Sequence, residues 1–122
     1  VIAAWNDHDY GINDGGAECP MKKQSKEVFL DFWDEPKNSE RRKREGIYTS
    51  YYFGEGNYRL QIILLDNRNF KTLWETGKRN GIEGYISGTT REVAMLGEAQ
   101  CNRLEKTYRL LPPGSLTKCG TI

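Results

Sequence analysis

The amino-acid sequence predicts an α/β fold that forms one domain. Two segments, Ser25–Glu35 and Gly97–Leu110, carry apolar residues at helical spacing, and two others, Ile47–Phe53 and Tyr58–Leu65, have the composition of strands. At 122 residues the chain is long enough to bury a core of its own. Three Trp, seven Tyr and four Phe supply bulky side chains for that core, although the mean hydropathy of -0.75 is low.

Charge and cysteine content disfavour several classes of protein. Lys and Arg total 18 against 17 Asp and Glu, so a net charge of +1 gives no long-range field for a nucleic-acid partner, and we expect none. No apolar run approaches the roughly 20 residues that span a bilayer. The three cysteines form no C-x-x-C pair, which disfavours a zinc knuckle and leaves room for one disulfide and one free thiol.

The N-terminal segment Val1–Trp5 is apolar, and its small and branched residues predict the end of a buried strand. A polar cluster of Asp7, His8 and Asp9 follows directly, and a glycine-rich loop comes after it. In sheets covered by helices, sites form in the loops beyond the strand ends. We therefore expect these three side chains to face one shared cavity.

The first helix is predicted over Ser25–Glu35. Ser25 has the chemistry of an N-cap, and Pro36 ends the helix. Four large apolar residues fall on one face, which predicts that this face packs into the core. They are Val28, Phe29, Phe32 and Trp33.

A charged connector is predicted from Asn38 to Glu45. Its basic run, Arg41–Arg44, has the composition of a nuclear address or a nucleic-acid patch. Glu40 and Glu45 flank the run, which favours a solvated connector instead.

A β-hairpin is predicted next, with Ile47–Phe53 and Tyr58–Leu65 joined by a turn at Gly54–Asn57. The continuous apolar run Ile62–Leu65 is typical of a strand buried on both faces. From Asn69 to Arg91 the Gly, Asn and Thr content predicts a long irregular stretch, of the kind that often belongs to a site.

The second helix is predicted from about Gly97 to Leu110. Its apolar residues follow at spacings of three, four and three, and they are Cys101, Leu104, Tyr108 and Leu111. Two prolines and a glycine then break the chain, and residues 112–122 carry no core pattern, so we expect a poorly defined tail.

The polar cluster suits metal-assisted phosphate chemistry. Carboxylate and imidazole groups are ligands for divalent and trivalent cations, and an imidazole can pass a proton to a leaving group. On composition alone, a polar turn that simply hydrogen-bonds His8 fits equally well. A standard EF-hand loop does not fit, because the sixth position counted from Asp7 is Ile12 where that loop needs Gly.

Five ordered blocks resemble those of the alkaline phosphatase D-like metallophosphoesterases. The blocks are Trp5–Gly16, Phe29–Pro36, Gly46–Tyr51, Leu64–Arg68 and Met95–Gln100. The resemblance implies that residues 1–111 form the central part of such a domain. It implies a calcineurin-like α/β fold, with a central β-sheet flanked by helices, which this chain would contain incompletely at both ends.

The resemblance also implies hydrolysis of phosphate monoesters or diesters at a centre of several metal ions, calcium and iron being typical. Asp7 resembles the metal ligand, His8 the acid that protonates the leaving oxygen, and Asp9 the carboxylate that orients His8. Arg68 resembles a group that binds the substrate phosphate, and the alternative is a structural ion pair with Asp66 or another acid.

The chain departs from the family in several places. Asn6 stands where the family usually has Asp, and Cys101 and Arg103 stand where it tends to have Trp. His8 is the only histidine, too few for the family's ligand set. We therefore expect a segment of a longer enzyme with little activity of its own.

Two alternatives to an enzyme segment stay open. One is a non-catalytic relative that keeps the fold, with or without a cation site, and the other is a basic-patch binding module. Many family members are exported, so a secreted or endomembrane location is compatible with the resemblance, while the compartment and the oligomeric state stay open.

Overall fold

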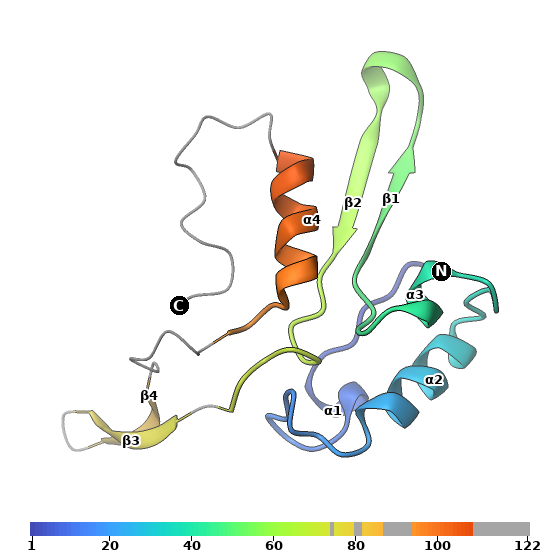
Figure 1. Cartoon of the computed structure of the whole chain (residues 1–122). Helices are drawn as coiled ribbons and strands as arrows, with labels where there is room; N and C mark the ends of the chain where they lie inside the picture. Colours follow the sequence, from blue (N-terminus) through green and yellow to red (C-terminus); the bar gives the residue numbers. More distant parts are fainter. Residues whose placement is uncertain (74, 80–81, 87–93, 109–122) are drawn as a thin grey trace.

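The computed structural model describes residues 1–73, 75–79, 82–86 and 94–108. Within these residues the chain is a small mixed α/β structure with helices and two separate two-stranded antiparallel sheets (Figure 1). The elements, in chain order, are α1 (Asp7–Tyr10), α2 (Lys22–Phe32), α3 (Glu40–Lys43), β1 (Thr49–Phe53), the 3₁₀ turn η1 (Gly56–Tyr58), β2 (Leu60–Leu64), β3 (Glu75–Arg79), β4 (Ile82–Ile86) and α4 (Glu98–Tyr108). The α/β class predicted from the sequence is confirmed at this level.

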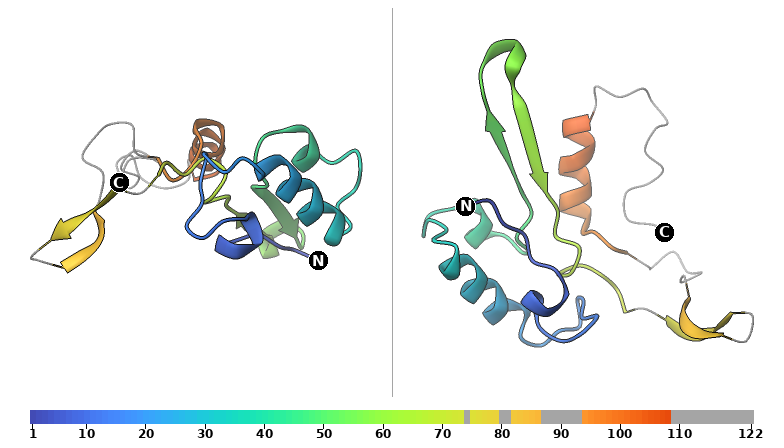
Figure 2. Two further views of the ribbon diagram at one scale, coloured as in Figure 1. Left: turned by 90° about the horizontal axis from the view of Figure 1, so that it is seen from below. Right: turned by 180° about the vertical axis from the view of Figure 1, so that it is seen from behind.

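The β1–β2 hairpin forms as predicted, with Thr49 opposite Leu64 and Phe53 opposite Leu60. Helix α4 lies beside it in both Figure 1 and Figure 2, and side chains of the hairpin and of α4 line a common hollow. The strand β2 is not buried on both faces, because its side chains are mostly half-buried and Leu65 is 40% exposed. In the described part of the chain, β1 is the only strand that pairs with β2.

A second hairpin, β3–β4, replaces part of the irregular stretch predicted over Asn69–Arg91, so that prediction was wrong. Glu75 lies opposite Ile86 and Arg79 opposite Ile82. The strands β3 and β4 were not predicted, because glycines and charged residues, which are weak strand formers, interrupt both of them. This hairpin stands apart from the other elements in both views of Figure 2.

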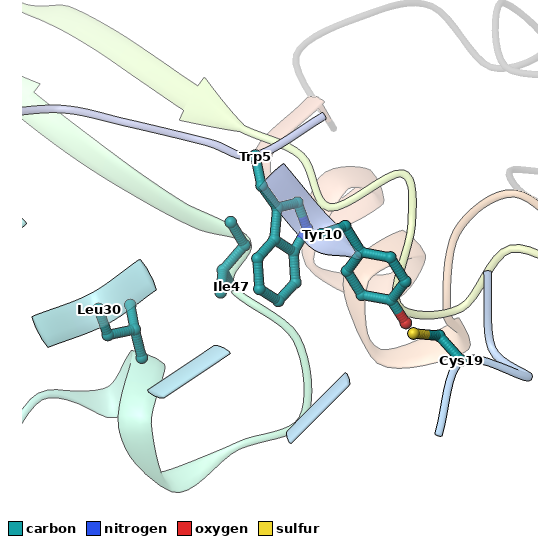
Figure 3. Packing of buried hydrophobic residues seen from close by; sticks show 5 residues of the cluster. All are labelled: Trp5, Tyr10, Cys19, Leu30 and Ile47. Carbon is teal, nitrogen blue, oxygen red and sulfur yellow. The ribbon is translucent and has the colours of Figure 1, made fainter. Parts of the chain in front are cut away.

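The core joins the N-terminal segment to α1, α2 and the chain before β1 (Figure 3). Its buried side chains are Trp5, Tyr10, Cys19, Leu30 and Ile47. The Trp5 ring meets Tyr10 edge to face at a centroid distance of 5.0 Å and lies 5.4 Å from the ring of Phe29. Aromatic pairs of this kind stabilise beyond the area that they bury.

Helix α2 begins one turn earlier than predicted. Ser25 is not the N-cap, because its backbone nitrogen donates to the Met21 carbonyl at 2.9 Å inside the helix. Residues 22–24 are two lysines and a glutamine, which are strong helix formers and extend the helix toward the N-terminus.

The predicted core face of α2 was wrong in part. Val28 and Phe32 are 70% and 74% exposed, while Leu30, which the pattern left out, is fully buried. Phe29 does pack against the core. The helix is rotated so that Phe29 and Leu30 point inward, because Trp5 and Ile47 offer the apolar surface on that side.

The N-terminal segment is not a strand in this structure. Residues 1–6 have no regular structure, Val1 is 91% exposed, and no described strand pairs with the segment. The Ala3 carbonyl instead accepts a hydrogen bond from Arg41 Nη2 at 3.0 Å. A strand needs a partner for its backbone groups, and here a side chain takes that place.

The basic run is not a solvated connector in its first half. Arg41 is 3% exposed, its Nη1 pairs with Glu35 at 3.0 Å, and its Nε donates to the Ile47 carbonyl at 2.8 Å. The Arg42 guanidinium is also largely buried and pairs with two acidic side chains of α2. The flanking charges did not reveal this burial because the partners lie elsewhere in the sequence.

The second predicted helix is confirmed as α4, with Cys101 buried and Leu104 half-buried. Leu111, Cys119 and the predicted tail 112–122 lie outside the described residues. Cys19 and Cys101 are both buried. None of the described helices has the length and apolar character to cross a membrane.

Candidate phosphoester site

Asp66 is the centre of a buried polar network. Its carboxylate is fully buried and accepts four hydrogen bonds. Oδ1 accepts from Trp5 Nε1 at 2.9 Å, from the Arg68 backbone at 3.1 Å and from the Asn69 backbone at 2.9 Å, and Oδ2 accepts from the Ile47 backbone at 2.8 Å. These donors replace the water that a buried carboxylate loses.

Gln100 joins α4 to the same centre. It is 1% exposed, its Oε1 accepts from the Asp66 backbone nitrogen at 2.7 Å, and its Nε2 donates to the Asp66 carbonyl at 2.9 Å. Four of the five sequence blocks thus meet directly at Asp66, and the remaining block reaches it through the contact of Phe29 with Trp5. The sequence signal for this centre is an aspartate directly after the apolar run of β2.

Asp7 lies on the inner side of α1, toward this network. Its Oδ1 accepts from the Asp14 backbone nitrogen at 2.6 Å and pairs with Arg68 Nη1 at 3.2 Å. The side chain is about one quarter exposed. Helix α1 itself is short, and the Asn6 backbone nitrogen donates to Asp9 at 3.3 Å across its first turn.

Arg68, the residue predicted for substrate binding, is 8% exposed. Besides its pair with Asp7, its Nη2 donates to Asn6 Oδ1 at 3.3 Å. The structural ion pair that the sequence left open is present, and its acid is Asp7 rather than Asp66. Within the described residues, the buried Nε of Arg68 has no hydrogen-bond acceptor, so the guanidinium keeps a donor for a further ligand.

A second cation lies on this inner side. Lys71 is 1% exposed, and its Nζ donates to the Asp14 carbonyl at 2.7 Å. Burial, followed by the positive charge of Arg68, lowers the pKa of Lys71. No sequence pattern selects Lys71, because its burial depends on the loop around Asp14 that folds over it.

His8 and Asp9 lie on the outer side of α1. Both are exposed, and both line a hollow of about 540 Å³ between α1 and α2, to which Val28 and Phe32 also contribute. Asp7 is not among the residues that line this hollow. The structure therefore brings Asp7 to Arg68 and places His8 with Asp9 in a different surrounding, so the three do not face one shared cavity. Asp7 is separated from His8 and Asp9 because neighbouring residues of a helix point in different directions.

The described residues do not by themselves fit a metal ion. Among them, no three His, Cys, Asp or Glu side chains gather around a common point. The Oδ1 of Asp7 is already bonded to Asp14 and Arg68. A calcium or iron site that used Asp7 would need further ligands from elsewhere, and this geometry speaks neither for nor against such a cofactor.

No protein-family model, curated protein or solved structure matches the chain. The roles assigned to Asp7, His8, Asp9 and Arg68 therefore stay predictions from the resemblance of the sequence blocks.

Proposed function

We propose that this chain is a segment of a metal-dependent phosphoric ester hydrolase of the alkaline phosphatase D-like class, with part of a calcineurin-like fold. The observation that supports this most is that four of the five resembling blocks meet at one buried residue, Asp66, while the fifth is joined to it through the contact of Phe29 with Trp5. Blocks that resemble one family in order and spacing, and that also meet in space, are expected of an inherited structural unit. The partner is a phosphate monoester or diester.

In this proposal each site residue has one task, although His8 and Asp9 lie on the other side of α1 from Asp7 and Arg68. His8 donates a proton to the oxygen of the leaving alcohol, and Asp9 is the carboxylate that orients His8. Arg68 binds phosphate oxygens through a guanidinium that Asp7 and Asn6 already hold in place. Asp7 is the one metal ligand predicted here, and calcium and iron, the metals that the resemblance implies, would need further ligands from outside the described residues.

The experiment is hydrolysis of an alkyl phosphate monoester and an alkyl phosphate diester, whose leaving alcohols need protonation, by the longest natural polypeptide that contains this chain. We expect His8→Ala to lower kcat by about 100-fold or more, the usual effect of losing a general acid. The matched control is Gln24→Ala, another exposed residue of the same hollow, which should change kcat less than about twofold.

Two results would contradict the proposal. If a folded His8→Ala variant hydrolysed the esters at the full rate, His8 would have no part in the reaction. Turnover by the 122-residue chain alone that disappears in His8→Ala would show that the chain is a complete enzyme rather than a segment.

A second candidate is a relative that keeps this structure without catalysis. The Asp7–Arg68 pair favours it, because a carboxylate bonded to a guanidinium is a poorer ligand for a metal ion. If the longer polypeptide folds but hydrolyses neither ester with calcium, iron, manganese or zinc present, this candidate replaces the first.

A further inference from the structure

A basic cleft lies between the N-terminal half of α2 and the chain that follows α3. Its volume is about 610 Å³, and two glutamates and six basic side chains line it. The basic residues are Lys22, Lys23, Lys26, Arg42, Lys43 and Arg44. Six positive against two negative side chains leave an excess of positive charge in one hollow, although the whole chain has a net charge of only +1.

Half of these cations are paired with carboxylates. Arg42 pairs with two acids of α2, Lys22 pairs with Glu45 at 3.0 Å, and Lys43 pairs with Glu40 at 2.8 Å. These three charges are neutralised locally.

The other three are not neutralised in this way. Lys26 donates to two neutral groups, the carbonyls of Arg42 at 3.1 Å and Arg44 at 2.5 Å. Arg44 donates to the Tyr48 carbonyl, and its guanidinium lies 4.4 Å from the centre of the Tyr48 ring. Within the described residues, no carboxylate forms an ion pair with Lys23, Lys26 or Arg44.

One buried donor of the cleft also lacks a partner. Arg44 Nε has no hydrogen bond within the described residues, while the side chain of Asn69, which is 3% exposed, lies against the Glu45 carboxylate. Buried donors without acceptors are rare in folded proteins and often mark a position where a ligand supplies the acceptor. The ligand that this arrangement favours is rich in acceptor oxygens.

Helix α2 adds to the positive potential. Its first turn holds Lys22 and Lys23 and no acidic residue, although the helix dipole is positive at this end and favours Asp or Glu there. Burial lowers the pKa of Lys26; Glu27 and Glu45 oppose this shift, while Arg44 and Arg42 add to it.

We propose that this cleft binds a small oligophosphate anion, with Lys23, Lys26 and Arg44 as the principal contacts. Such an anion carries several negative charges and many acceptor oxygens in a volume that the cleft can hold. A nucleic-acid strand fits less well, because the basic residues converge on one hollow instead of following a track along the surface. The proposal does not depend on phosphoester hydrolysis.

Isothermal titration of the 122-residue chain at low ionic strength tests it, with inorganic tripolyphosphate and ATP as separate probes. We expect saturable one-to-one binding, weakened about tenfold or more by the double substitution Lys23→Gln with Lys26→Gln. The matched control is Lys37→Gln, which removes the same charge from an 82% exposed side chain paired with Asp31 outside the cleft. It should change the affinity less than about twofold.

The single variant Lys23→Gln guards against misfolding, because Lys26 also holds two backbone carbonyls, and it should weaken binding about threefold or more. Equal affinity for the two probes would assign recognition to the phosphate chain, and tighter binding of ATP would assign it to a nucleotide. The proposal is wrong if tripolyphosphate fails to saturate, if Lys23→Gln matches Lys37→Gln, or if only a single-stranded oligonucleotide binds.

Discussion

The two sides of α1 differ sharply, although they are formed by neighbouring residues. On the inner side, Asp7 is bonded to Arg68 next to the network of Asp66, whose buried carboxylate accepts four hydrogen bonds. On the outer side, His8 and Asp9 are exposed above a hollow whose wall includes the bare apolar side chains Val28 and Phe32. The comparison teaches that the buried hydrogen bonds that stabilise the fold lie on the inner side, while His8, the proposed acid, lies on the outer side.

The largest expected effect belongs to the centre of the inner side. Asp66→Asn places an amide donor against backbone and indole donors, and we expect a loss of at least about 3 kcal/mol in the free energy of unfolding, measured with urea. The matched control, Asp31→Asn, alters an exposed carboxylate of α2 and should leave the urea midpoint close to that of the unmodified chain. Equal urea midpoints for the two variants would show that Asp66 does not stabilise the fold more than an exposed carboxylate does.

Helix α2 extends the comparison, because one of its faces is buried and the other is bare. Leu30→Ala should cost about 2–5 kcal/mol, since Leu30 is fully buried. Phe32→Ala should stay within about 0.5 kcal/mol, since Phe32 is 74% exposed. Thermal or urea unfolding of both variants measures these losses in the free energy of unfolding. A large loss in Phe32→Ala would mean that the outer side is covered in solution.

Gly46 tests how tightly the chain packs next to Asp66. It has φ +74°, and a Cβ there would lie 2.8 Å from Phe70 Cε2 and 2.9 Å from Asp66 Oδ2. Gly46→Ala should therefore cost about 2–4 kcal/mol, from backbone strain and overpacking together. Gly56→Ala, at φ +55° in open space, should cost only about 1 kcal/mol from strain alone. Equal losses in urea unfolding would mean that the contacts around Gly46 are loose.

Tyr10 gives the smallest effect and depends on pH. Burial, followed by the nearby Cys19 and Asp66, raises the pKa of Tyr10, so the folded chain keeps its phenolic proton above pH 10 while the unfolded chain loses it. The contribution of Tyr10 is therefore complete below pH 10 and is lost as the pH rises above it. Tyr10→Phe loses the bond to the Gly16 carbonyl and should cost about 1 kcal/mol at pH 8.

At pH 11 ionisation of the unfolded phenol costs the natural chain up to about 1.4 kcal/mol, so the advantage of Tyr10 over Phe should vanish or reverse. Urea unfolding at both pH values measures it. A difference that does not change with pH would show that the Tyr10 hydroxyl reaches water freely.

The parts of the fold that the sequence predicted are those with a local signal. The β1–β2 hairpin follows from two apolar strands around a glycine turn, and α4 follows from its apolar spacing. The burial of Arg41 and the orientation of α2 could not be predicted, because both depend on partners far along the chain, such as Ile47 and Trp5.

The sequence identified residues of the candidate site but did not predict how they lie relative to one another. The blocks selected Asp7, His8 and Arg68. A loop beyond a strand end was expected where the chain forms α1, and the helical turn sends Asp7 and His8 to different sides. Asp66 carried a usable signal, an acid directly after an apolar strand. Two of its four donors, Trp5 and Ile47, come from distant segments, and only the folded chain shows them.

Hydrogen exchange at the donors around Asp66 tests the central claim most directly. If the five blocks form one unit around this carboxylate, the Trp5 indole N–H and the amides of Ile47 and Asn69 open together, with one common free energy close to that of global unfolding. Independent exchange of the three, with the Trp5 indole unprotected while the two amides stay protected, would contradict the claim.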